Sequence, residues 1–247
     1  MSRADFFLWI ALPYLCIAVF VVGHVWRWRT DQLHWGARST QLLENRLLRW
    51  GSPLFHFGIL AVIGGHVLGL LIPESWTHAV GITEDGYHVL AVVGGGTAAV
   101  ATIAGLVILV YRRTANARVR ATTSKADIAA YAMLFVVILS GTWAVLGENL
   151  ILGTYEYRLT VSPWFRGIFQ FSPDANFMNG APFIYQLHAV SAFLLIALWP
   201  FTRLVHAWSA PVTYPMRRPI IYRSRTAAGR GIAALRARGN GTTDVGP

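Results

Sequence analysis

The chain has 247 residues, of which 55% are hydrophobic and 13% are charged, and its formal net charge is +10. The charged fraction is about half of what soluble proteins carry, which disfavours a soluble domain and favours a chain of mostly lipid-facing helices. The single cysteine, Cys16, excludes an internal disulfide, a thiolate zinc site, an iron–sulfur cluster and covalently attached c-type haem.

Five segments are long and apolar enough to cross a bilayer as helices, which takes about 20 mostly apolar residues. None alternates apolar and polar residues, so a transmembrane barrel is excluded and helices remain as the spanning structure. The predicted fold is therefore an all-α integral membrane bundle of five helices. In chain order, the predicted spans are Asp5–Trp26, Pro53–Ile72, His88–Tyr111, Ile128–Leu146 and Pro182–Val205.

The basic residues gather on one side of this predicted bundle. Of the 21 lysines and arginines, 18 fall after the first span, after the third span, or at and beyond the end of the fifth. The opposite side keeps only Arg3, Arg158 and Arg166. Because cytoplasmic loops are enriched in Lys and Arg, we predict a bacterial cytoplasmic-membrane protein with its N-terminus outside and its C-terminus in the cytoplasm. This distribution explains the net charge without nucleic-acid binding.

The segments between and beyond the spans are less regular. Arg3 is the only basic residue before the first span, and no small-residue cleavage site follows a short apolar core. We therefore expect an uncleaved helix and not a signal peptide. The longest outer loop, Glu148–Ala181, is rich in aromatic residues and is expected to fold partly on the membrane surface. Residues 226–247 are small, polar and basic, which predicts a disordered cytoplasmic tail after a transmembrane domain of residues 1–225.

Four of the eight histidines lie inside predicted spans: His56 and His66 on the second, and His188 and His206 on the fifth. An ionisable side chain at membrane depth is rare and indicates function. The second and fifth helices run in opposite directions. His56 and His206 therefore share the inner depth, and His66 and His188 share the outer depth. The sequence predicts two pairs of facing imidazoles.

Helix geometry supports this pairing with one mismatch. His188 and His206 are 18 residues apart, which is five full turns, so they share one face of a continuous helix and differ in depth by about 27 Å. His56 and His66 differ by only about 15 Å. Oblique ligation, helix tilt or a bend has to absorb the difference of about 12 Å, and Pro200 lies where a kink would serve.

The number of ligands at each depth points to haem. A bare zinc or copper ion needs three or four ligands at one depth, whereas each depth here offers two. Iron protoporphyrin is flat and apolar and needs only two axial histidines, so the count favours two b-type haems inside the bundle.

Glycines and arginines nearby suit the same cofactor. Gly58, Gly65 and Gly69 form a narrow stripe on the second span, which allows a macrocycle or another helix to approach closely. Haem propionates need cations, and three arginines are expected at the inner depth: Arg112, Arg113 and Arg203.

Three runs of the sequence resemble the gamma subunit of respiratory nitrate reductase, a membrane cytochrome b of a quinol-oxidising molybdenum complex. They are FHFGILAVIGGHVLGLLIPE (55–74), RRTANARVRATTSKADI (112–128) and LHAVSAFLLIALWPFTRLVHAWSAPVTY (187–214). The resemblance extends to about residue 225. It implies an inner haem b on His56 and His206 and an outer haem b on His66 and His188. It also implies that electrons pass to an iron–sulfur beta subunit and then to a molybdenum alpha subunit that reduces nitrate.

The resemblance further implies that quinol is oxidised near the outer haem, with electrons moving inward against about 2.3 kcal/mol per elementary charge per 100 mV. Some relatives carry a lysine just before the third span, where this chain has GYHVL, so Tyr87 or His88 is expected to replace it. The quinol site is therefore expected around Gly65, His66, Tyr87 and His88.

Two other interpretations remain open from the sequence. The chain is also compatible with a related di-haem anchor that serves another cytoplasmic reductase. A more distant interpretation is a transporter or haem-free scaffold whose four histidines form a proton relay. A reduced-minus-oxidised spectrum separates haem from no haem, and a co-purified molybdenum subunit identifies the reductase.

Overall fold

The structure is a computed structural model that describes residues 2–31, 39–153 and 155–208. These ranges belong to one compact unit, residues 1–209, and no strand occurs among them. The predicted all-α fold is therefore confirmed for the described part of the chain. The predicted boundary after residue 225 and the predicted tail, residues 226–247, lie outside the described residues.

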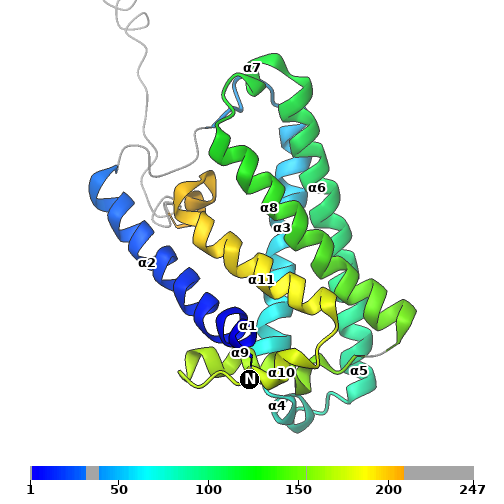
Figure 1. The fold of residues 1–247 in the computed structure, drawn as a ribbon. Coiled ribbons are helices and arrows are strands. Elements are labelled where there is room, and N and C mark those ends of the chain that lie inside the picture. The colour runs from blue at the N-terminus through cyan, green and yellow to red at the C-terminus, as the bar shows by residue number, and fades with distance from the viewer. Residues whose placement is uncertain (1, 32–38, 154, 209–247) are drawn as a thin grey trace, which may run out of the picture. The chain divides into compact units, whose positions relative to one another are not determined.

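Five helical segments are long and apolar enough to cross a membrane, as predicted (Figure 1). The first four are longer than the predicted spans because the helices continue into polar ends. Capping boxes, Ser2 with Asp5 and Ser124 with Asp127, begin the first and fourth. The segments are Arg3–Thr30, Leu48–Leu71, Glu84–Ala115, Lys125–Leu152 and Phe183–Phe201.

Each of the first four spans combines α-helix with a π-helical stretch at the end predicted to face outward. π-Helical turns are rare overall, and those that occur often lie at functional sites. In chain order, the spans consist of α1 (Arg3–Phe6), η1 (Phe7–Ala11) and α2 (Leu12–Thr30); α3 (Leu48–His66) and η3 (Val67–Leu71); α5 (Glu84–Val89), η4 (Leu90–Gly94) and α6 (Gly95–Ala115); and α8 (Lys125–Thr142) and η5 (Trp143–Leu152).

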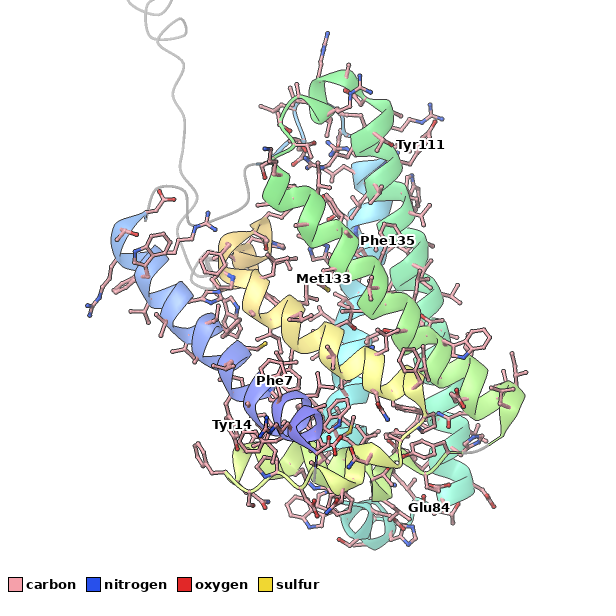
Figure 2. All side chains as sticks on the ribbon, in the orientation of Figure 1. Phe7, Tyr14, Glu84, Tyr111, Met133 and Phe135 are labelled. Atoms are coloured by element: carbon pink, nitrogen blue, oxygen red, sulfur yellow. The ribbon has the colours of Figure 1, made fainter. Side chains whose placement is uncertain are left out.

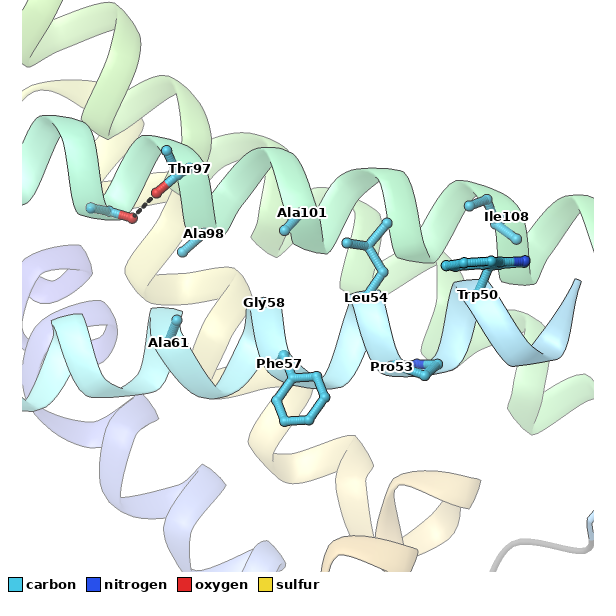
Figure 3. Close-up of a pocket in the computed structure, with 11 residues that line it drawn as sticks. Trp50, Pro53, Leu54, Phe57, Gly58, Ala61, Thr97, Ala98, Ala101 and Ile108 are labelled. Atoms are coloured by element: carbon cyan, nitrogen blue, oxygen red, sulfur yellow. Dashed lines mark hydrogen bonds between the residues drawn. The ribbon is translucent and has the colours of Figure 1, made fainter.

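The helices pack in a defined order. α11 (Phe183–Leu198) lies against α2 and α8, and α3 lies along α6 (Figure 1). Glycines permit the close contact between α3 and α6. A Cβ at Gly58 would come within 2.7 Å of the Thr102 backbone nitrogen, and a Cβ at Gly105 would collide with the Phe55 backbone. Residues of α3 and α6 line an apolar groove along this helix pair, and Trp50 is one of them (Figure 3).

The fifth span differs from the prediction of one continuous helix to Val205. α11 ends at Leu198 and gives way to a 3-10 turn, η7 (Trp199–Phe201), that contains Pro200. Proline has no backbone N–H to continue the helical ladder, and its ring clashes with the preceding turn. The backbone is then extended at Thr202, with φ −120° and ψ 179°.

A second 3-10 turn, η8 (Arg203–Ala207), follows this break and carries His206. The prediction that His188 and His206 share one face of a continuous helix is therefore wrong. The break supplies the bend that the unequal histidine spacings required, because His206 no longer has to follow the axis of α11.

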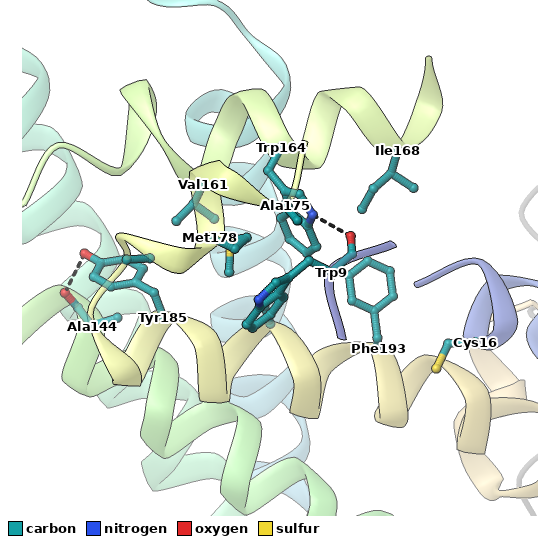
Figure 4. Close-up of a cluster of buried hydrophobic side chains, with 12 residues drawn as sticks. Trp9, Cys16, Ala144, Val161, Trp164, Ile168, Ala175, Met178, Tyr185 and Phe193 are labelled. Atoms are coloured by element: carbon teal, nitrogen blue, oxygen red, sulfur yellow. Dashed lines mark hydrogen bonds between the residues drawn. The ribbon is translucent and has the colours of Figure 1, made fainter. Parts of the chain in front are cut away.

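Short helices cover the outer end of the bundle: α4 (Glu74–Ala79), η6 (Tyr157–Leu159), α9 (Val161–Phe169) and α10 (Asn176–Asn179). The predicted partial folding of the outer loop is confirmed. α9 buries Val161, Trp164 and Ile168 in a cluster with Trp9 and Phe193 (Figure 4). The Trp164 indole N–H donates to the Trp9 carbonyl oxygen at 2.7 Å, which ties α9 to the first span.

The opposite end holds the connections predicted to be cytoplasmic, including α7 (Ala117–Arg120). Figure 2 shows Glu84 at one end of the bundle and Tyr111 toward the other.

Candidate functional site

The structure brings the two predicted histidine pairs together. The rings of His66, at the end of α3, and His188, on α11, have centroids 5.8 Å apart and planes inclined by 31°. The rings of His56, on α3, and His206, on η8, have centroids 5.9 Å apart and planes inclined by 71°. α3 thus faces α11 at the outer pair and η8 at the inner pair.

All four imidazoles are held by the same type of hydrogen bond. Each Nδ1 lies near a backbone carbonyl oxygen, and because a carbonyl only accepts, each Nδ1 must carry the proton. In its neutral form, a ring held in this way presents an unprotonated Nε2 that is available to a metal. The bonds are His56 to Ser52 (2.7 Å), His66 to Val62 (2.8 Å), His188 to Val137 (3.0 Å) and His206 to Arg203 (2.6 Å).

The spacing of the rings fits one metal ion between each pair. A metal–nitrogen bond of about 2 Å on either side, added to the size of the rings, places two axial imidazole centroids about 6 Å apart. Within the described part of the chain, neither pair belongs to a larger group of protein ligands. Among the described residues, the one group of three or more close His, Cys, Asp or Glu ligand atoms is Glu74, His78 and Glu84.

A metal centre with two axial imidazoles and no further protein ligand suits haem, whose macrocycle supplies the other four nitrogens. The residues present therefore fit the group. Its binding stays a prediction.

Two residues of α8 position the imidazole of His188, and the sequence predicted neither of them. The Ser140 hydroxyl lies 3.1 Å from His188 Nδ1, and a Cβ at Gly141 would come within 2.8 Å of the His188 ring. Only a glycine at this position lets the imidazole lie against α8 in this geometry. The small, polar run Ser140–Thr142 inside an apolar span was the available signal.

The inner ring is positioned through Arg203. Its carbonyl oxygen accepts the His206 Nδ1–H, and its guanidinium donates twice to the Asp127 carboxylate, at 2.7 and 3.0 Å. Asp127 thus fixes the turn that carries His206. The sequence predicted Arg203 as a propionate contact but did not indicate its bond to Asp127.

The other two predicted propionate arginines are buried and also have protein partners. Arg112 donates to the Glu44 carboxylate and to the Thr40 hydroxyl. Arg113 donates to Thr123 at 3.0 Å and lies 3.9 Å from Asp127. Their role toward propionates stays a prediction.

The glycines differ in their surroundings. Gly58 meets α6, and Gly69 lies against the hydroxyls of Tyr87 and Tyr157. A Cβ at Gly65 would meet nothing within 4 Å, so open space adjoins this residue beside His66. Within the described residues, Gly65 is therefore the one glycine of the predicted stripe that has no close neighbour on its Cβ side.

Tyr87 and His88 lie on α5, where the third span begins. Tyr87 is 5% exposed, and its hydroxyl lies 2.7 Å from that of Tyr157. Burial raises the pKa of Tyr157 well above its ordinary value, which keeps this phenol protonated. The Nε2 atom of His88 is buried and has no hydrogen-bond partner among the described residues. The structure gives no direct contact between these side chains and Gly65.

Comparisons with known proteins agree on one family. A family model described as nitrate reductase gamma subunit matches residues 5–225. The nitrate reductase gamma chain of Bacillus subtilis is 44% identical over 89% of this chain and 98% of its own length. The respiratory nitrate reductase 1 gamma chain of Escherichia coli is 33% identical over 91% of this chain and 100% of its own length. The nitrate reductase-like protein NarX of Mycobacterium tuberculosis is 48% identical, but this chain spans 33% of its length.

Proposed function

Since the chain belongs to the nitrate reductase gamma subunit family, we propose that it is a di-haem cytochrome b that carries electrons from quinol to the other subunits of a nitrate reductase. The observation that supports this most directly is the presence of two imidazole pairs with ring centroids 5.8 and 5.9 Å apart, each ring held through Nδ1 by a backbone carbonyl. The reaction at nitrate belongs to a partner subunit, and this chain supplies binding and transfer.

In this proposal His66 and His188 hold the outer haem b, and His56 and His206 hold the inner haem b. Bound haem supplies one-electron redox chemistry at two depths. The chain's own residues fix both rings of each pair: the Nδ1–H bonds set the tautomer, Ser140 and Gly141 orient His188, and Asp127 acts on His206 through Arg203.

Quinol binds at the outer end, around Gly65 and His66, with Tyr87 and His88 nearby on the third span. Gly65 adjoins open space, and the buried His88 Nε2 has no hydrogen-bond partner among the described residues. An imidazole nitrogen without a partner can accept a proton, so His88 suits a quinol proton. Release of the protons outside, with electrons moving inward, makes the reaction conserve energy.

The electrons leave toward an iron–sulfur beta subunit and a molybdenum alpha subunit on the cytoplasmic side. The basic inner connections face that side in the orientation that the charge distribution predicts. Exposed arginines on α7, Arg118 and Arg120, are available to a partner surface or to anionic lipid.

The test is spectroscopic. The purified complex should show b-type bands in a reduced-minus-oxidised spectrum, a haem content of two per chain, and reduction of both haems by added quinol. A chain that binds no haem in an active complex would contradict the proposal and favour a proton relay. A partner without molybdenum would identify an anchor for a different reductase.

A further inference from the structure

We propose that Glu84, with His78 and Glu74, forms the outlet through which protons from quinol oxidation reach the outer solution. This inference rests on the proposed function, because it requires quinol oxidation at the outer end. Oxidation of one quinol breaks two O–H bonds and yields quinone, two electrons and two protons. The electrons leave through the cytochrome to the acceptor subunits, and the protons need acceptors between the quinol and water.

Glu84 lies in the right place on the fold. It is the first residue of α5, and His88 follows four residues later on the same helix. Residues four apart share a helix face and differ in height by about 6 Å. Glu84 is therefore one turn closer to the outer solution than His88 and lies on the same side of α5.

Glu84 is part of a cluster that reaches water. Its carboxylate lies 2.7 Å from His78 Nε2, and the same nitrogen lies 3.8 Å from the Glu74 carboxylate. The side chains of Glu84, His78 and Glu74 are 40%, 48% and 34% exposed, respectively. The cluster thus joins α4 to the start of the third span and opens to solvent.

Arg158 connects the cluster to the buried tyrosines. Its guanidinium lies 3.4 Å from the Glu84 carboxylate and 4.0 Å from the centre of the Tyr87 ring, and it donates to Thr77 at 2.9 Å. Tyr87 in turn meets Tyr157. This buried cation fixes the position of the Glu84 carboxylate between the quinol-site residues and the surface.

The side-chain chemistry suits proton transfer. A carboxylate and an imidazole can each accept a proton and pass it on. A proton that leaves the quinol oxygen first forms an N–H bond on the His88 imidazole, as in the proposed function. It then leaves that imidazole and forms an O–H bond on Glu84, and His78 passes it to water. The cluster contains an imidazole and two carboxylates, which is enough capacity for both protons of one quinol.

The same contacts would exist if the cluster merely joined α4 to α5, so the test uses variants that keep hydrogen bonding and lose titration. Glu84→Gln and His78→Gln meet this requirement. Asp85→Asn, which changes the neighbouring exposed carboxylate, is the matched control. Quinol oxidation by the whole complex in sealed vesicles would be followed together with an impermeant pH dye on the outer side.

We expect both test variants to retain the haem spectrum of the wild type. Their turnover should fall about 100-fold or more, as when a positioned proton-transfer group is lost. Imidazole added outside should restore much of the rate, because a diffusing base replaces the missing acceptor. Asp85→Asn should behave as the wild type.

Zn²⁺ added outside gives a readout independent of turnover. The three ligand atoms of the cluster lie within 4.8 Å of one another, close enough for one ion to draw them together. Zinc should bind the wild-type complex in a calorimetric titration and inhibit it, and both effects should be lost in His78→Gln.

The outcomes separate the two proposals. Unchanged turnover and zinc sensitivity in both test variants would overturn the outlet and leave the proposed function intact. A slow variant that imidazole fails to restore would assign the cluster a structural role and would also overturn the outlet. A wild-type complex that does not oxidise quinol would overturn the proposed function and, with it, this inference.

Discussion

At the scale of single residues, one hydrogen bond determines what each histidine of a pair can do. Donation from Nδ1 to a carbonyl leaves the nitrogen lone pair of a neutral ring on Nε2, and each ring lies beside the second imidazole of its pair. His24 shares the bond, to Phe20 at 2.7 Å, but its ring neighbours are Phe20 and Trp208. His24 and the four paired histidines thus have the same Nδ1 hydrogen bond. What distinguishes a candidate ligand from His24 is a second imidazole beside its ring.

His66→Ala should therefore remove the outer haem and leave the inner one. The expected result is half the haem content of the wild type and loss of quinol oxidation, because His188 alone cannot complete an axial pair. Haem quantitation and the difference spectrum measure this directly. His24→Ala is the control and should keep the full haem content; a loss there equal to that in His66→Ala would contradict the assignment.

Gly141→Ala tests the positioning of His188 without removing a ligand. The added Cβ would lie 2.8 Å from the ring, so the imidazole has to move. We expect a shifted potential or partial loss of the outer haem, with the inner haem unchanged, in a redox titration of the purified complex. Gly94→Ala, where the nearest atom lies at 3.8 Å, is the matched control. Equal effects of both substitutions would indicate a general response of the helices.

At the scale of elements, the sequence predicted the spans well and their interruptions poorly. Hydrophobic runs are long enough to identify all five segments, since lipid demands about 20 apolar residues in each. Pro200 marked a kink in the fifth span, but the extended residue at Thr202 and the 3-10 turn beyond it depend on tertiary bonds such as Arg203 to Asp127. Such bonds join residues 76 positions apart, and no local pattern announces them.

Arg112 is the main link between the first inner connection and the third span. It is 3% exposed and donates to Glu44 and Thr40. Removing one partner of a buried ion pair typically costs about 3–5 kcal/mol. We expect Arg112→Ala to lower the unfolding temperature in detergent clearly, whereas Arg118→Ala, at an exposed position on α7, should change it little.

The loss in Arg112→Ala should depend on pH. Burial acts to raise the pKa of Glu44, but hydrogen bonds from the Leu47 N–H and Arg112 outweigh it and hold the pKa below the ordinary 4.5. A carboxyl with a lowered pKa stabilises the folded state above its ordinary pKa, and that stabilisation disappears as the pH falls through the folded value. The difference between wild type and Arg112→Ala should therefore shrink in acid. A constant difference would mean that Glu44 contributes no charge to the link.

At the scale of the whole molecule, the histidine pairing followed from topology alone. Alternating span directions placed His56 with His206 and His66 with His188 before any distance was known, and the rings do lie together. The supporting residues, among them Ser140, Gly141 and Asp127, did not follow, because a serine or glycine in an apolar helix has many ordinary uses. Histidines at membrane depth are rare enough to be identified from the sequence. The residues that position them could be identified only from the structure.

The orientation of the bundle decides the direction of every proposed transfer, so it merits its own measurement. The count of basic residues predicts that the Glu84 end lies outside and the α7 end in the cytoplasm. In a Cys16→Ser background, Ser75→Cys and Ala121→Cys introduce exposed thiols at opposite ends. An impermeant maleimide applied to intact cells should label the first and spare the second until the membrane is broken. The reverse pattern would put the proposed quinol site on the cytoplasmic side, where proton release no longer adds to the membrane potential.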